Sequence, residues 1–121
     1  MVSALIVDDQ DDIRFLVRTI IESSDAGVVV AGEAASGAEA FERLAAGGVD
    51  VALVDVVIPP GADFAVAREV RAHYPELPVV LFSAHVDSET EEMAAELGAA
   101  ACVEKSDVAG IPGVLRQVVG P

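Results

Sequence analysis

Short apolar runs recur along the chain and alternate with longer segments that have helical periodicity. The runs cover residues 4–7, 28–31, 51–54, 79–82 and 101–103. Continuous apolar runs of this length, bounded by turn residues, predict strands that are buried on both faces. In the segment after the first run, Ile13, Leu16, Val17, Ile20 and Ile21 recur at the spacing of one helix face.

Capping signals predict where two of the helices begin and end. Ser36 with Glu39 forms a capping box, and Gly47-Gly48 ends the helix that follows. Ser88 with Glu91 forms a second capping box, and Gly98 closes that helix.

Two further helices are predicted from periodicity alone. Phe64, Ala67 and Val70 indicate a third helix that stops before Pro75. Residues 111–119 carry the pattern of a last helix, whose start is weak because glycines and a proline surround Ile111.

Five strands alternating with five helices predict an α/β fold with a doubly wound parallel sheet. Because crossovers are right-handed, the leading candidate is a single (βα)5 flavodoxin-like domain with strand order 2-1-3-4-5. We expect this domain to cover residues 1–121, with no output domain in this chain.

Composition narrows the classes of function. The 121 residues are 53% hydrophobic, which is enough for a buried core, and carry a formal net charge of −14. Nucleic acids and anionic membranes are poor partners for such an acidic domain, so a cation or a basic protein surface fits better. The sequence contains neither a membrane-spanning apolar run nor a signal peptide, and one Cys permits no internal disulfide, so we expect a cytoplasmic protein.

Carboxylates follow two strands that the predicted sheet makes neighbours. Asp8 and Asp9 come after the first strand, and Asp55 ends the third. The carboxyl ends of parallel strands meet at one edge of the sheet, where ligands bind. Adjacent acids also suit a solvated turn, but three converging carboxylates call for a proton or a cation, and hard oxygen ligands favour Mg²⁺.

Two more polar residues stand at the same edge. Lys105 follows the fifth strand and Ser83 ends the fourth. Taken singly, each suits a solvated or capping position, whereas together they could hold the oxygens of a phosphoryl group. With a carboxylate as nucleophile, this set suits phosphoryl transfer. The sequence holds no glycine-rich phosphate loop, and we expect His73 and His85 to be surface residues.

These motifs together resemble the receiver domain of two-component response regulators, over essentially all 121 residues. They are the acid pair after the first strand, an Asp ending the third strand with Pro59 four residues later, Ser83-Ala84 after the fourth, and Lys105 after the fifth. The segment 32–40 also resembles regulators that carry helix-turn-helix output domains.

The resemblance implies a role for each residue at the metal. Asp55 is the phospho-acceptor served by a histidine kinase or phosphotransfer protein. Asp9 and Asp55 bind Mg²⁺ directly, Asp8 binds it mainly through water, and Val57 offers its backbone carbonyl.

The resemblance also implies how the signal leaves. Lys105 pairs with the phosphoryl group, and Ser83 moves toward it and shifts the face made by the fourth helix, fifth strand and last helix. This face controls an output domain or partner and allows for a homodimer. Such domains catalyse their own phosphorylation and slow dephosphorylation but turn over no separate substrate. We therefore expect that this chain is not an enzyme in the usual sense.

The chain departs from the family pattern at three places. Pro60-Gly61 follows Pro59 where the family has Met and a small polar residue, Cys102 stands at the position of the family's switch aromatic, and Ser106 replaces the usual Pro after the lysine. The phosphorylation chemistry is therefore expected to be intact and the relay to the output face to be altered.

Two alternatives remain open at this point. One is an interaction module that keeps the fold and signals without phosphorylation, which the absent ring at Cys102 motivates. The other is a metal-dependent phosphohydrolase with Asp55 as nucleophile, although such enzymes place a second acid where this chain has Val57.

Overall fold

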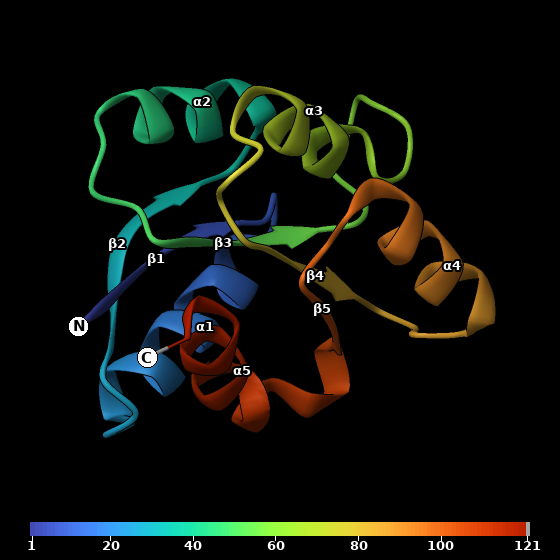
Figure 1. Cartoon of the computed structure of the whole chain (residues 1–121). Helices are drawn as coiled ribbons and strands as arrows, with labels where there is room; N and C mark the ends of the chain where they lie inside the picture. The colour runs from blue at the N-terminus through green and yellow to red at the C-terminus, as the bar shows by residue number, and fades with distance from the viewer. Residues whose placement is uncertain (121) are drawn as a thin grey trace.

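The computed structural model describes residues 1–120 as a five-stranded parallel sheet with helices on both faces (Figure 1). The sheet order is β2-β1-β3-β4-β5, as predicted, with strands β1 (Val2–Val7), β2 (Val28–Ala34), β3 (Val51–Asp55), β4 (Val79–Ser83) and β5 (Ala101–Glu104). The helices are α1 (Asp11–Ser23), α2 (Gly37–Ala45), α3 (Ala65–His73), α4 (Ser88–Leu97) and α5 (Ile111–Val119).

Both faces of the sheet are covered, which explains why the strand sequences are continuously apolar. Side chains alternate along each strand, so Leu5 and Val7 belong to the hydrophobic cluster that includes residues of α2, α3 and α4, whereas Ala4 and Ile6 belong to the cluster that includes residues of α1 and α5. Figure 1 shows these two helical layers on opposite sides of the sheet. Burial of this kind of surface stabilises the fold by about 25 cal/mol per Å².

The start of α2 follows the predicted capping box with one difference. Ser36 Oγ accepts a hydrogen bond of 3.2 Å from the amide of Glu39, as expected. The Glu39 carboxylate in return accepts from the amide of Ala35 at 2.9 Å, one residue earlier than a capping box predicts.

The predicted capping box at Ser88 is wrong. The N-cap of α4 is Asp87, whose carboxylate accepts from the amide of Thr90 at 2.9 Å, and Ser88 is the first helical residue. Both residue types cap helices well, but the Asp87 carboxylate also accepts from the Thr90 hydroxyl and adds a negative charge at the helix N-terminus.

The last helix begins where the sequence predicts a weak start. A 3-10 segment, Lys105–Gly110, leads into α5, and Pro112 lies in its first turn. A proline there removes an amide hydrogen that would have no helical acceptor, so it is tolerated. The fifth strand therefore passes through a tight segment straight into the helix, and Lys105 lies at the junction.

The register of the sheet brings four strand ends to one edge. Val7 pairs with Val54, Asp55 with Phe82, and Ser83 with Glu104. The side chains that follow these positions consequently meet above the carboxyl ends of β1, β3, β4 and β5.

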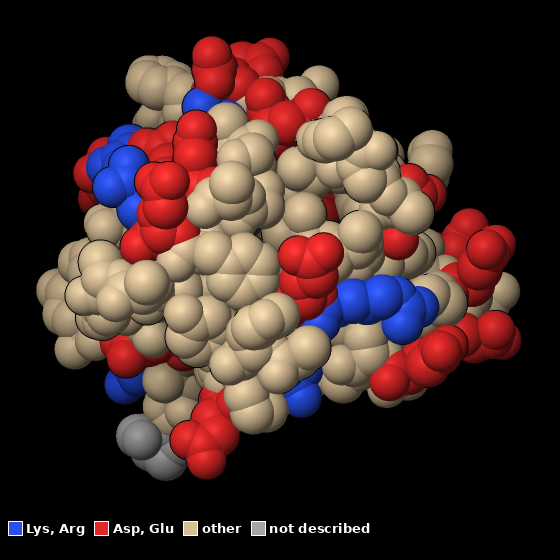
Figure 2. All heavy atoms as spheres, turned by 90° about the horizontal axis from the view of Figure 1, so that it is seen from above, with Lys and Arg blue, Asp and Glu red and all other residues tan. Residues whose placement is uncertain are grey.

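Acidic side chains dominate the surface, as the net charge of −14 requires. Figure 2 looks onto the molecule from above Figure 1 and shows carboxylates spread around the rim, with few Lys and Arg side chains beside them. Within residues 1–120, no helix is long and apolar enough to cross a bilayer.

Candidate functional site

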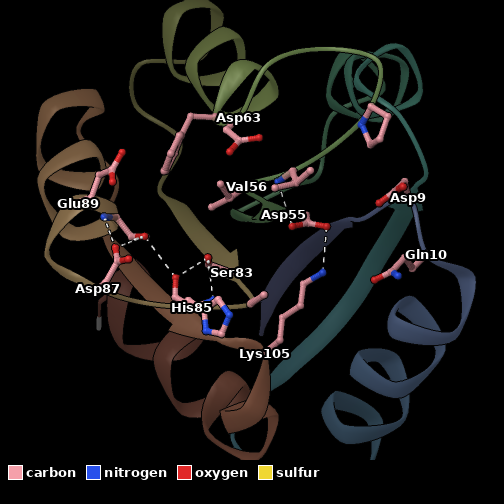
Figure 3. Close-up of a pocket in the computed structure, with 15 residues that line it drawn as sticks. Asp9, Gln10, Asp55, Val56, Asp63, Ser83, His85, Asp87, Glu89 and Lys105 are labelled. Atoms are coloured by element: carbon pink, nitrogen blue, oxygen red, sulfur yellow. Dashed lines mark hydrogen bonds and ion pairs between the residues drawn. The ribbon is translucent and has the colours of Figure 1, made fainter.

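A pocket of about 490 Å³ opens at this edge of the sheet (Figure 3). Its walls come from the loops after β1, β3 and β4 and from the start of the 3-10 segment. The residues that line it are Asp9, Gln10, Asp55, Val56, Val57, Pro59, Asp63, Phe64, Ser83, Ala84, His85, Asp87, Glu89, Thr90 and Lys105. All the predicted site residues except Asp8 line this pocket.

Three carboxylates converge here, as the strand order predicts. One carboxylate oxygen from each of Asp8, Asp9 and Asp55 lies within 4.8 Å of the other two. Asp8 is fully buried, Asp55 is 5% exposed, and Asp9 is exposed to solvent. The cluster therefore has a buried floor and one carboxylate that faces the open pocket.

Lys105 is the cation that faces the two buried acids. Its Nζ lies 3.0 Å from Asp55 Oδ2 and 3.2 Å from Asp8 Oδ2. The ammonium also stands 5.4 Å from the centre of the Phe82 ring, within the range of a cation–π contact. Charge and ring together hold the lysine over the acids, as the strand-end pattern predicts.

The pKa values of Asp55 and Lys105 are shifted by burial and by the charge of the partner residue. Burial raises the pKa of Asp55 above its ordinary value, against the opposing effects of the hydrogen bond from Lys105 and the amide of Val57, and the nearby Asp8 charge raises it further. For Lys105, burial acts to lower the pKa, but the hydrogen bond and charge of Asp55, with that of Asp8, outweigh it and raise the pKa.

The donor set fits a hard divalent cation. Asp8 Oδ2 is buried and, within residues 1–120, makes no hydrogen bond of good geometry, although Lys105 Nζ lies at ion-pair distance. The three carboxylates outnumber the single lysine, and no sulfur or imidazole ligand belongs to the cluster. Oxygen-only ligands of this kind suit Mg²⁺.

Ser83 and Val57 lie beside Asp55 but make different contacts. The amide of Val57 donates to Asp55 Oδ1 over 3.2 Å. The hydroxyl of Ser83 donates to the carbonyl oxygen of His85 at 2.7 Å, and the amide of His85 donates back to Ser83 Oγ at 3.3 Å. Ser83 is thus tied to the loop that follows β4.

Sequence reasoning missed the polar group at the start of α4. The Thr90 hydroxyl donates to Asp87 Oδ1 at 2.9 Å and contacts the carbonyl oxygen of His85 at 3.3 Å. Thr90 is buried, so the loop after Ser83 is held from both ends. The sequence does contain a signal for this contact, because the side chain of an Asp can accept a hydrogen bond from a Thr three residues later at the start of a helix.

The loop after Pro59, where the chain departs from the family pattern, has its own closure. The amide of Phe64 donates to the carbonyl of Val56 at 2.8 Å. Phe64 has φ of 68°, a left-handed conformation that is uncommon for a bulky residue. Phe64 lines the pocket and packs against the hydrophobic cluster that includes residues of α3. This packing favours the left-handed backbone at Phe64.

Cys102, at the position of the missing switch aromatic, is half-buried and packs against the core on the α4 side. Burial raises the pKa of its thiol, so the group stays neutral. His73 and His85 are exposed, as expected.

The parallel sheet, the pocket and the acid–lysine cluster together define an α/β domain of the receiver type. The sequence profile of the response regulator receiver domain matches residues 4–110. The chain therefore belongs to the response regulator receiver family.

Relatives of known description agree with this assignment. The chain is 31% identical over 120 residues to protein-glutamate methylesterase/protein-glutamine glutaminase 4 of Geobacter metallireducens, covering 97% of this chain and 34% of that protein. It is 32% identical over 113 residues to the DNA-binding transcriptional activator DevR/DosR of Mycobacterium tuberculosis, covering 92% of this chain and 50% of that protein. The chain thus spans between a third and half of these relatives.

Solved structures share the fold. A LuxR-family two-component response regulator from Aurantimonas sp. superposes with a TM-score of 0.86 at 26% identity, covering 97% of this chain and 84% of that one. The response regulator domain of Thermotoga maritima CheB superposes with a TM-score of 0.85 at 20% identity, covering 98% of this chain and 96% of that one. At this identity the similarity shows a shared fold and nothing further.

Proposed function

We propose that residues 1–121 form a receiver domain that accepts a phosphoryl group on Asp55 from a histidine kinase or phosphotransfer protein in the cytoplasm. The observation that carries the proposal is the contact of Asp55 with Lys105, beside Asp8 and Asp9, in an open pocket. A nucleophilic carboxylate, a fixed cation and a cluster of oxygen ligands are the parts that phosphoryl transfer requires.

In the proposed step, a carboxylate oxygen of Asp55 attacks the phosphorus of the donor. An O–P bond forms, the bond from phosphorus to the donor nitrogen or oxygen breaks, and the leaving group departs with the electron pair. Lys105, which already lies 3.0 Å from Oδ2, pairs with the oxygens of the transferred group. Hydrolysis of the acyl phosphate returns the domain to its starting form without turnover of a separate substrate.

Mg²⁺ would be held by the carboxylates of Asp9 and Asp55 and the carbonyl of Val57, with Asp8 acting mainly through water. When bound, it neutralises charge on the phosphoryl oxygens. Burial of Asp8 and Asp55 supports this assignment, because it restricts the orientation of both side chains while Asp55 still lines the open pocket.

Phosphorylation would change the face formed by α4, β5 and α5, which would control an output domain or partner or form a homodimer. Ser83 would exchange its bond to the His85 carbonyl for one to the phosphoryl group. That exchange would release one end of the loop that Thr90 holds at the other. A covalent charge would thereby bias the conformation of this loop.

A second candidate function follows from Cys102, which cannot supply the ring of the usual relay. In this alternative the domain binds a partner and signals without phosphate. Beryllofluoride distinguishes the two, because the primary proposal expects amide shifts in α4 and α5 when it binds, and the alternative expects none there.

The experiment is the intact mass of the protein after incubation with acetyl phosphate, with and without Mg²⁺. We expect one added phosphoryl group that requires Mg²⁺ and is absent from Asp55→Asn. Asp63→Asn is the matched control, because it makes the same change at an exposed carboxylate of the same pocket. Labelling of Asp55→Asn, or neither labelling nor beryllofluoride binding by the folded wild type, would contradict the proposal.

A further inference from the structure

Arg14, in the first turns of α1, contacts the backbone of the acid pair. Its Nη1 donates to the carbonyl oxygen of Asp8 at 2.6 Å, and its Nη2 bonds to Asp11. The Arg14 side chain is only 13% exposed, although it lies near the surface end of the sheet. A guanidinium this well covered is held in one orientation by its partners.

The anchor for Arg14 lies on the neighbouring strand β2. Arg14 Nε lies 3.3 Å from Glu33 Oε1, and the second oxygen of Glu33 accepts from Arg18 Nε at 2.6 Å. Glu33 is therefore bound from two turns of α1 at once. These ion pairs link α1 to β2. They also place the guanidinium of Arg14 against the backbone of the segment after β1, which contains Asp8 and Asp9.

The carbonyl that Arg14 holds belongs to the peptide between Asp8 and Asp9. The other groups of Asp8 are already fixed, since its amide donates to Ala34 O at 3.0 Å and its Oδ1 accepts from the amide of Gln10 at 2.9 Å. Rotation of this one peptide would redirect Asp9, the exposed carboxylate of the cluster, while leaving the buried one in position.

We infer that Arg14 is a positioning residue for the cation site: through the Asp8–Asp9 peptide it directs the Asp9 carboxylate toward the metal. This inference rests on the proposed Mg²⁺ site and extends it to a residue that would not itself contact the metal. Groups that orient metal ligands from behind typically change metal affinity by about 10- to 100-fold when they are removed.

Charge alone predicts the opposite outcome. Arg14 pairs with Asp11 and Glu33 and donates to the carbonyl of Asp8, so removing its positive charge makes the local potential more negative and attracts Mg²⁺ more strongly. A positioning role predicts weaker binding instead. Arg14→Lys separates the two effects, because lysine keeps the charge but lacks the planar fork that serves three partners.

The experiment is a Mg²⁺ titration of the purified protein, followed by the amide resonances of residues 8–10 and 55, with thermal unfolding as a check of the fold. We expect Arg14→Lys and Arg14→Gln to weaken Mg²⁺ affinity by about tenfold or more. In the metal-free proteins, the amide resonances of Asp9 and Gln10 should broaden or shift. Arg43→Gln, which removes an exposed arginine bonded to the Glu33 backbone, controls for net charge and should bind like wild type.

Unchanged or tighter Mg²⁺ binding by folded Arg14→Gln, or wild-type affinity in Arg14→Lys, would overturn the inference. Should both Arg14 variants fail to fold, Glu33→Asp decides, because it keeps the negative charge but shortens the side chain that anchors Arg14. Weaker binding by that variant would support the inference, and unchanged binding would overturn it. Failure of wild type to bind Mg²⁺ would instead refute the proposed site itself.

Discussion

Asp55 is in an environment that opposes its own charge. Burial and the neighbouring Asp8 both disfavour the ionised carboxyl, and the bond from Lys105 offsets them only in part, so its pKa is raised. Active carboxylates in other folds are tuned in the same manner, by burial against a nearby partner. The fold accordingly gives up some stability at Asp55 in order to keep a reactive oxygen in the pocket.

This cost predicts a stabilising substitution. The pKa of Asp55 in the folded protein lies above the unfolded value of about 3.9. Protonated Asp55 therefore contributes stability that is fully present below the unfolded pKa and is lost as pH rises through the folded pKa. With chelator present, we expect Asp55→Asn to exceed wild type in free energy of unfolding at neutral pH. Urea denaturation at several pH values measures this, and the difference should shrink toward zero in acid.

Asp63→Asn serves as the control for this experiment, because Asp63 is an exposed carboxylate in the same pocket. Its unfolding free energy should follow wild type across the pH range. A lower stability of Asp55→Asn than of wild type at neutral pH would mean that the Lys105 contact outweighs the burial of the carboxyl.

At the scale of elements, the ends of α3 and α4 are joined by one arginine. Arg71 donates to the carbonyl oxygens of Pro75 at 2.7 Å and of Leu77 and Leu97 at 3.3 Å. The α4 helix ends at Gly98, whose φ of 82° is left-handed, and an added Cβ there would lie 3.0 Å from Arg71 Nη2. The helix end and the arginine therefore constrain each other.

Two glycine substitutions separate backbone strain from this contact. Gly47 directly follows the C-cap of α2, has the same φ of 82°, and has no atom within 4 Å of an added Cβ. We expect Gly47→Ala to lower the free energy of unfolding by about 1 kcal/mol, from the left-handed backbone alone. Gly98→Ala should cost more, because Arg71 must give up bonds to make room.

Denaturant unfolding of both variants, repeated in an Arg71→Ala background, tests this reading. The extra cost at Gly98 should disappear when Arg71 is absent, whereas the cost at Gly47 should not change. Equal costs at both glycines in the wild-type background would mean that the arginine moves aside freely.

The elements also show what a sequence can predict. Strand order and the meeting of Asp8, Asp55 and Lys105 follow from apolar runs and topology, because a strand end must lie at an edge of the sheet. Helix starts are less certain, since Asp87 and Ser88 are adjacent and both are good caps, so only the folded backbone chooses between them. Arg14 was missed for another reason: its contact with Asp8 depends on a rotamer set by Glu33, nineteen positions further along the chain.

At the scale of the whole molecule, two electrostatic effects influence stability. The net charge of −14 causes repulsion over the whole surface, whereas a bound cation would act only at the proposed metal site. Repulsion among exposed carboxylates falls as salt is added, because the Debye length shortens to about 10 Å at 0.1 M. A bound cation adds a separate term that depends on its own concentration. The two contributions can be told apart by comparing salts at equal ionic strength.

We expect MgCl₂ to raise the melting temperature more than NaCl does at matched ionic strength. At a hundredfold excess over Kd, specific binding contributes about 2.7 kcal/mol of additional stability. Asp9→Asn should lose most of this difference, because Asp9 is the exposed member of the cluster. Asp12→Asn, an exposed acid in the first turn of α1, should keep it. An equal response of wild type to the two salts would contradict a specific site.

The most direct test of the account is to find which side chain carries the phosphoryl group. Wild type is treated with acetyl phosphate and Mg²⁺, the acyl phosphate is reduced with borohydride, and peptide mass spectrometry locates the resulting homoserine. The account predicts homoserine at position 55 only, dependent on Mg²⁺, and lost in Asp55→Asn. Homoserine at position 8, 9 or 63, with position 55 unmodified, would contradict it.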